Sequence, residues 1–131
     1  MKRAINHLSL LLLLSIIVLP AETGYSQGTL KPGKIKKFVR KGRKAYRKGE
    51  YWKAKSFYDK VTNGGSTKAI HWFEAGLVYF DSQVKREDAS IYFEKAMEFS
   101  ANEKDTIPEL FYYAGKTYHF KEEYEKAIEY F

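Results

Sequence analysis

The sequence predicts an all-α fold in which antiparallel helix–turn–helix units stack as a short α-solenoid behind an N-terminal signal peptide. Three observations predict this fold. Apolar residues recur at helical spacing from residue 34 to the end. No stretch alternates with the period of two that a half-buried strand shows. The helical pattern itself repeats, with small and aromatic residues at matching offsets. A chain of 131 residues suits one small domain.

Residues 1–26 have the pattern of a secretory signal peptide. A basic start is followed by an apolar run at 8–19 and then by small residues. The run is shorter than the roughly 20 residues that span a bilayer as a helix. We expect cleavage before Gln27, with Ala21 as a second option and an uncleaved signal anchor as the alternative. In each case the rest of the chain is exported.

Six apolar stripes, each at helical spacing, predict six helices in three pairs. Pro32 and Gly33 delay the first helix, and Thr106 to Glu109 form a capping box before the fifth. The stripes lie at 35–46, 51–61, 72–80, 89–97, 110–118 and 124–131. The predicted divisions are a signal peptide at 1–26, a flexible lead-in at 27–33 and a repeat domain at 34–131, with units at 34–66, 67–100 and an incomplete 106–131.

Each unit has a glycine inside its first helix, in the same register. A mid-helix glycine costs about 1 kcal/mol relative to alanine, so we expect a close approach of the second helix to offset it. Small residues would lie at the helix crossing, and large rings would fill the space toward the following unit. The predicted packing residues are Gly42, Gly76 and Gly115, then Ala54, Ala89 and Ala127, then Tyr58, Phe93 and Phe131.

These spacings resemble those of the tetratricopeptide repeat, a 34-residue helical hairpin with aromatic–x₃–Gly, Gly–x–Tyr and Ala–x₃–aromatic elements. The resemblance covers 34–131. Two features depart from it: the second unit has Gln83-Val84-Lys85 where the turn motif is expected, and no unit ends with the usual proline. A related helical-hairpin repeat is the alternative.

The charge is strongly asymmetric along the chain. Residues 31–60 hold thirteen lysines and arginines against two acids, and residues 34–48 hold nine with no acid. Same-sign neighbours four residues apart each destabilise an exposed helix by a few tenths of a kcal/mol. One interpretation is a solvated face, partly neutralised by residues such as Glu74. The other is an anionic partner, namely an acidic protein segment, lipid headgroups or a cell-wall polymer. A nucleic-acid partner is not expected, because an exported chain meets little nucleic acid even though its charge would permit binding.

The tetratricopeptide resemblance implies a concave groove, lined by the first helices, that holds an extended peptide. A cationic end and an aromatic middle would suit an acidic or hydrophobic peptide. Val39 and Glu74 stand where the family's carboxylate clamp needs polar or basic groups, so that clamp is not expected. The implied groove residues are Val39, Arg40, Arg43, Tyr46 and Arg47, then Phe73, Leu77 and Phe80, then Tyr112, Lys116 and His119.

No catalytic motif is present in the sequence. The absence of cysteine excludes a disulfide framework, thiolate metal sites and a cysteine nucleophile. Besides His7 in the signal, His71 and His119 are 48 residues apart, and no HExxH or glycine-rich phosphate loop occurs. We therefore expect no enzyme activity, no cofactor and no metal site.

The expected function is that of a non-catalytic protein–protein interaction and assembly scaffold. A signal peptide followed by such repeats resembles the N-terminus of envelope proteins of Gram-negative bacteria. This resemblance implies a periplasmic or outer-membrane location. One alternative is a targeting or regulatory arm of a larger outer-membrane or peptidoglycan-associated protein or enzyme. The other is a charge-driven binder of anionic surfaces through the basic first helix.

The last stripe ends without a polar cover. A helical repeat array needs a polar capping face at each end, and Ile128 and Phe131 have none. The sequence therefore predicts either a truncated product or self-association through this end.

Overall fold

The computed structural model describes residues 28–131 except 84 and 105, so the signal-peptide prediction lies outside the described residues. The described part is all-α, as expected, and contains no strand. Its helices are α1 (Pro32–Arg47), α2 (Tyr51–Asn63), α3 (Ala69–Asp81), α4 (Ala89–Ser100), α5 (Leu110–Phe120) and α6 (Tyr124–Ile128), with a short 3₁₀ turn η1 (Arg86–Asp88) before α4. None of these helices has the length and apolar character that crossing a membrane requires.

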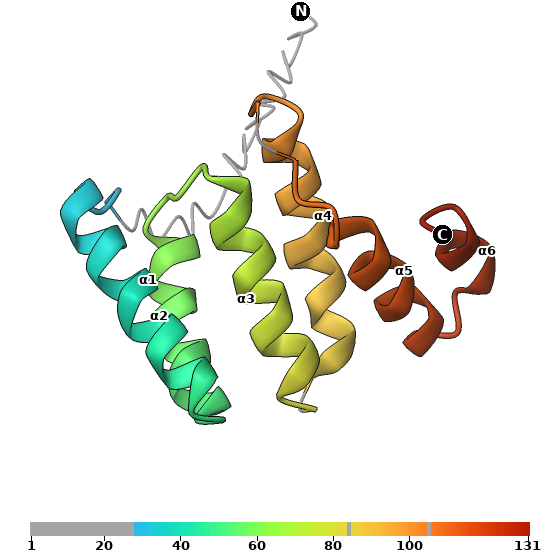
Figure 1. Ribbon diagram of the computed structural model, residues 1–131, viewed down its shortest axis with the longest axis horizontal. Coiled ribbons are helices and arrows are strands. Elements are labelled where there is room, and N and C mark those ends of the chain that lie inside the picture. The colour runs from blue at the N-terminus through green and yellow to red at the C-terminus, as the bar shows by residue number, and fades with distance from the viewer. Residues whose placement is uncertain (1–27, 84, 105) are drawn as a thin grey trace, which may run out of the picture.

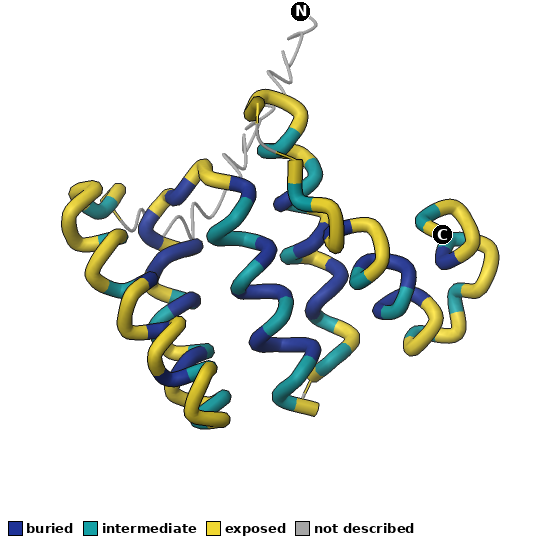
Figure 2. The backbone as a smooth tube through the Cα atoms, in the orientation of Figure 1, coloured by how far each residue is buried: buried dark blue, intermediate teal, exposed yellow. Residues whose placement is uncertain are grey.

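The helices form three hairpins that stand side by side in chain order (Figure 1). α1 packs on α2, α3 on α4 and α5 on α6, while α2–α3 and α4–α5 contacts join one hairpin to the next. Burial is concentrated on the middle hairpin, and the outer face of α1 and much of α6 are exposed (Figure 2).

The same glycine–ring contact recurs in all three hairpins. A Cβ added to Gly42 would lie 2.7 Å from the ring of Tyr58. The corresponding distances are 2.5 Å from Gly76 to Phe93 and 2.9 Å from Gly115 to Phe131. The glycines are thus needed because an aromatic ring of the second helix lies directly on the backbone of the first. Tyr58 and Phe93 also reach the following hairpin, as expected: the Tyr58 hydroxyl donates to Glu74 at 2.9 Å, and the Phe93 ring lies 6.0 Å from that of Tyr113.

The predicted alanines are buried as expected, at Ala54, Ala89 and Ala127. A second aromatic contact also recurs between the two helices of each hairpin. Ring centroids lie 6.3 Å apart for Phe38 and Phe57, and 6.1 Å apart for Trp72 and Tyr92. In the third hairpin the pair is Phe111 and Tyr130, at 6.4 Å.

The turns of the first and third hairpins share one backbone geometry. Gly49 has φ +71°, and Glu122, at the equivalent position, has φ +60°. The N–H of the next residue then donates to a carbonyl five residues back, at 3.0 Å, in both turns. Only glycine adopts this left-handed conformation without steric cost, so the third turn is strained where the first is not.

The two ends of the array expose side chains of different kinds: apolar side chains at the C-terminal end and lysines at the N-terminal end. The rings that lie on glycine are 2% exposed at Tyr58 and 0% at Phe93, because the next hairpin covers them, whereas Phe131 is 70% exposed. The predicted lack of cover over Ile128 and Phe131 is confirmed. At the other end, α1 presents lysines instead of apolar side chains.

Three predicted boundaries are wrong. α1 begins at Pro32, inside the expected lead-in, because proline is well accommodated in the first turn of a helix. The capping box at Thr106 does not form, and α5 begins at Leu110 without a side-chain cap. A helix starting at residue 107 would need Ile107 in the helical region, which the following proline disfavours. α6 ends at Ile128 rather than at the last residue.

We predict that Gly76→Ala destabilises the fold by about 1–3 kcal/mol, because the added methyl meets the fully buried ring of Phe93. Gly115→Ala is the matched control. Its methyl meets the exposed ring of Phe131, which can move away, and alanine gains helix propensity, so we expect little change or a slight stabilisation. Urea unfolding followed by circular dichroism measures both, and equal destabilisation would contradict the contact.

We further predict that Glu122→Gly stabilises the fold by roughly 0.5–1 kcal/mol, since it relieves a left-handed non-glycine residue. Gly49→Ala should destabilise it by about 1 kcal/mol for the converse reason, although no atom lies within 4 Å of the new methyl. Glu122→Ala removes the same charge but keeps the strain. If it stabilises as much as Glu122→Gly in thermal unfolding, the backbone explanation fails.

Candidate partner-binding surface

Eight of the nine cations of residues 34–48 form two stripes along α1 and its C-cap residue. At about 100° per residue, each stripe covers an arc of roughly 60°, and the two are about 100° apart. The groove stripe consists of Lys36, Arg40, Arg43 and Arg47. The end stripe consists of Lys37, Lys41, Lys44 and Lys48.

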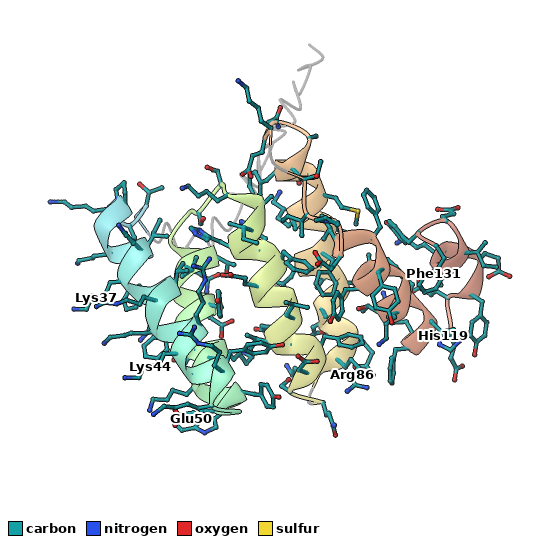
Figure 3. The ribbon with its side chains drawn as sticks, viewed as in Figure 1. Lys37, Lys44, Glu50, Arg86, His119 and Phe131 are labelled. Atoms are coloured by element: carbon teal, nitrogen blue, oxygen red, sulfur yellow. The ribbon has the colours of Figure 1, made fainter. Side chains whose placement is uncertain are left out.

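Specific contacts orient the two stripes. Arg43 Nε donates to Glu74 Oε1 of α3 at 2.8 Å, so the groove stripe faces the second hairpin. Lys41 Nζ lies over the ring of Phe57 of α2, 5.5 Å from its centroid, so the end stripe adjoins α2. Lys37 and Lys44 of the end stripe point away from the body of the protein (Figure 3).

Glu74 joins the first two hairpins. It accepts from Arg43 and, through Oε2, from the hydroxyl of Tyr58 at 2.9 Å. The hydrogen bond to Glu74 raises the pKa of Arg43. Burial, reinforced by Glu74, raises the pKa of Tyr58, so this phenol stays protonated. The predicted neutralisation of the basic helix through Glu74 is therefore present, but it involves one arginine.

Arg40 and Arg47 are exposed, and in the described part of the chain neither has an ion-pair partner. Tyr46 lies on the same side of α1 but is half-buried. Its hydroxyl donates to the carboxylate of Asp81 in α3, and its ring meets that of Tyr51 edge-on at 5.7 Å. Burial raises the pKa of Tyr46 as well. Its hydroxyl therefore stays protonated and donates the hydrogen bond to Asp81 that joins α1 to α3.

The structure contradicts three of the predicted groove contacts. Val39 and two aromatic residues of α3, Phe73 and Phe80, are buried core residues. The rings of Phe73 and Phe80 both meet that of Tyr113 in α5 edge-on, at 5.9 Å and 5.7 Å. These side chains fill the junction between hairpins, which is where large apolar surface is most stabilising. Of the predicted α3 residues, only Leu77 keeps a partly accessible side chain.

The α5 residues of the predicted groove remain accessible. Tyr112 is 52% exposed, and His119 is exposed with its ring against Tyr124 at 5.3 Å. Lys116 is half-buried, with Nζ 5.4 Å and 5.2 Å from the ring centroids of Phe80 and Tyr112. Cation–π contact therefore holds this ammonium beside the rings of α3 and α5.

Two features of this surface were not anticipated. Lys36 belongs to the groove stripe, and the 3.6-residue period alone could have identified it. Arg86 lies between the rings of Phe80 and Phe120, 4.9 Å and 4.4 Å from their centroids, and donates to the Phe80 carbonyl at 2.7 Å. No local pattern indicates this contact, because Arg86 comes from the turn before α4.

Ser66 and His71, at the start of the second hairpin, form a pairing that resembles part of a catalytic arrangement. Ser66 Oγ lies 2.7 Å from His71 Nδ1, and the N–H of Lys68 approaches Ser66 Oγ at 3.4 Å. Ser66 is buried in the turn before α3, where its hydroxyl stabilises the turn by accepting from the N–H of Lys68. Among the described residues, no group of three or more His, Cys, Asp or Glu could hold a metal ion.

We predict that His71 makes stability fall as the solution becomes acidic. Burial, then the charges of Lys68 and Arg43, lowers the pKa of His71, while Glu103 opposes the shift. Below about pH 6.5 the unfolded chain then binds more protons than the folded one, so stability present near pH 7.5 is lost toward pH 5.5.

His71→Gln should therefore lose less stability than the native chain between these two pH values in urea unfolding. His119→Gln, which removes the exposed histidine, serves as the control for the loss of one imidazole. The same slope in the native chain and in His71→Gln would contradict the prediction.

Comparison with protein-family models and with curated proteins finds no match to this chain.

Proposed function

We propose that this chain is a non-catalytic protein-binding and assembly module of the tetratricopeptide kind, acting in the bacterial cell envelope. Its three hairpins would form a short solenoid of two and a half to three units. The partner would be a protein with an acidic segment that lies along the groove stripe of α1. The envelope location rests on the signal-like pattern of residues 1–26.

The repeated internal contacts support the repeat assignment. Glycine–ring and aromatic-pair contacts occur in each hairpin at equivalent positions, which separate helices of unrelated sequence would not produce. Repeat arrays of this kind provide extended surfaces that bind peptides. A fold by itself does not determine a partner, so the choice of partner rests on the side chains of α1.

One observation carries the proposed partner. Of the nine cations between residues 34 and 48, only Arg43 has an ion pair within the described chain. The like-charged neighbours destabilise α1, and an acidic ligand would remove that repulsion. Arginine also suits carboxylates, because its guanidinium donates two parallel hydrogen bonds to one carboxylate. The burial of Phe73 and Phe80 favours an acidic over a hydrophobic segment.

The test compares two charge-matched variants on an array of acidic 12-residue peptides and their Asn/Gln counterparts. Arg40→Gln/Arg47→Gln removes two exposed cations from the groove stripe. Lys37→Gln/Lys44→Gln removes two from the end stripe of the same helix. We expect the arginine variant to lose about tenfold or more in affinity for the acidic peptides, and the lysine variant to lose much less.

Circular dichroism confirms that both variants keep the native helix content before binding is compared. Equal losses in the two variants would show that net charge alone is responsible. Native-like binding by the folded arginine variant, or no preference for acidic peptides, would refute the groove-stripe proposal.

A further inference from the structure

A second basic surface covers the first hairpin at the end of the array, away from the groove. It combines the end stripe of α1 with two lysines of α2, Lys53 and Lys60. Lys41 and Lys60 extend over the Phe57 ring, with Nζ 5.5 Å and 5.8 Å from its centroid. A shallow hollow of about 270 Å³ between the two helices is lined by lysines around Phe57. We call this surface the lysine end face.

The need for a polar surface at this end follows from the hairpin register. With the three glycines aligned, Lys41 and Lys44 correspond to Ala75 and Val78 of α3, and those two are buried against the first hairpin. In α5 the corresponding residues, Ala114 and Thr117, are buried as well. Lysines at these positions therefore cap the array, since they cannot pack against a further apolar hairpin.

Capping explains why these side chains are polar, but not why they are all cations. A mixture of acids and bases would cover the end equally well and would avoid the repulsion between neighbours in α1. The acid in the lining of the hollow, Glu50, is already paired with Lys53 at 3.2 Å. The uniform sign of the charge therefore requires another reason.

We propose that the lysine end face docks on an anionic lipid surface. Its cations are all lysines, whereas the groove stripe contains three arginines. Lysine is a strongly hydrated point charge without the arginine fork, so it suits a diffuse layer of headgroups better than one defined carboxylate. Each lysine held near such a surface contributes to binding through the surface potential.

The test is co-sedimentation of the full chain with vesicles of 30% phosphatidylglycerol in phosphatidylcholine and with pure phosphatidylcholine vesicles. Because residues 8–19 are apolar in every variant, the measured quantity is the preference for anionic over neutral vesicles. We expect the native chain to prefer anionic vesicles, and we expect added salt to reduce that preference.

Two variants with the same loss of charge locate the binding face. Lys37→Gln/Lys44→Gln/Lys48→Gln should reduce the preference about tenfold or more, whereas Lys36→Gln/Arg40→Gln/Arg47→Gln should reduce it less than threefold. Lys37→Arg/Lys44→Arg/Lys48→Arg should bind like the native chain.

Three results would overturn the proposal: no preference for anionic vesicles, equal losses in the two triple variants, or loss of acidic-peptide binding but not vesicle binding in the lysine variant. The proposed function is tested separately, by the affinity of Arg40→Gln/Arg47→Gln for acidic peptides. Failure of the vesicle experiment therefore does not decide it. All the substituted α1 side chains are exposed, and circular dichroism verifies that each variant is folded.

Discussion

The contact on which the structure depends is an aromatic ring from the second half of a hairpin lying on a glycine of its first helix. It fixes the distance and the register of each hairpin, because the ring occupies the space that any Cβ would take. The same contact also sets the next junction. The Tyr58 ring lies on Gly42 while its hydroxyl reaches Glu74 of the second hairpin. Tyr58 thus both packs its own hairpin and joins that hairpin to the next one.

The register has a direct consequence for charge. Because the first helix of each hairpin presents the same positions to the preceding one, the lysines of the end stripe are forced onto the exposed end of the array. The arginines, a quarter-turn away, lie on the side that faces the second hairpin, where Glu74 neutralises one of them. One basic helix therefore carries two surfaces of different chemistry. Total charge does not distinguish them, but the direction in which each stripe faces does.

Much of the fold could be predicted from sequence. Helical periodicity located all six helices, and the matching glycines, alanines and rings identified the hairpins. The candidate site was predicted less well. Arg40, Arg47 and Tyr112 are accessible as expected, but Phe73 and Phe80 are buried, since α5 closes over them. An apolar residue on an exposed face and one buried between two hairpins have the same helical spacing. The sequence therefore could not show which of them is accessible to a partner.

By itself the sequence determined the helices, their pairing and the position of the glycines, because these follow from periodicity and from the absence of a Cβ, which are local properties. Only the tertiary structure decided which ring covers which glycine, which aromatic residues are buried between hairpins, and which neighbour each basic stripe faces. Those outcomes depend on contacts between residues distant in the chain. Burial is set by the neighbouring hairpin, and no residue's own surroundings in the sequence specify it.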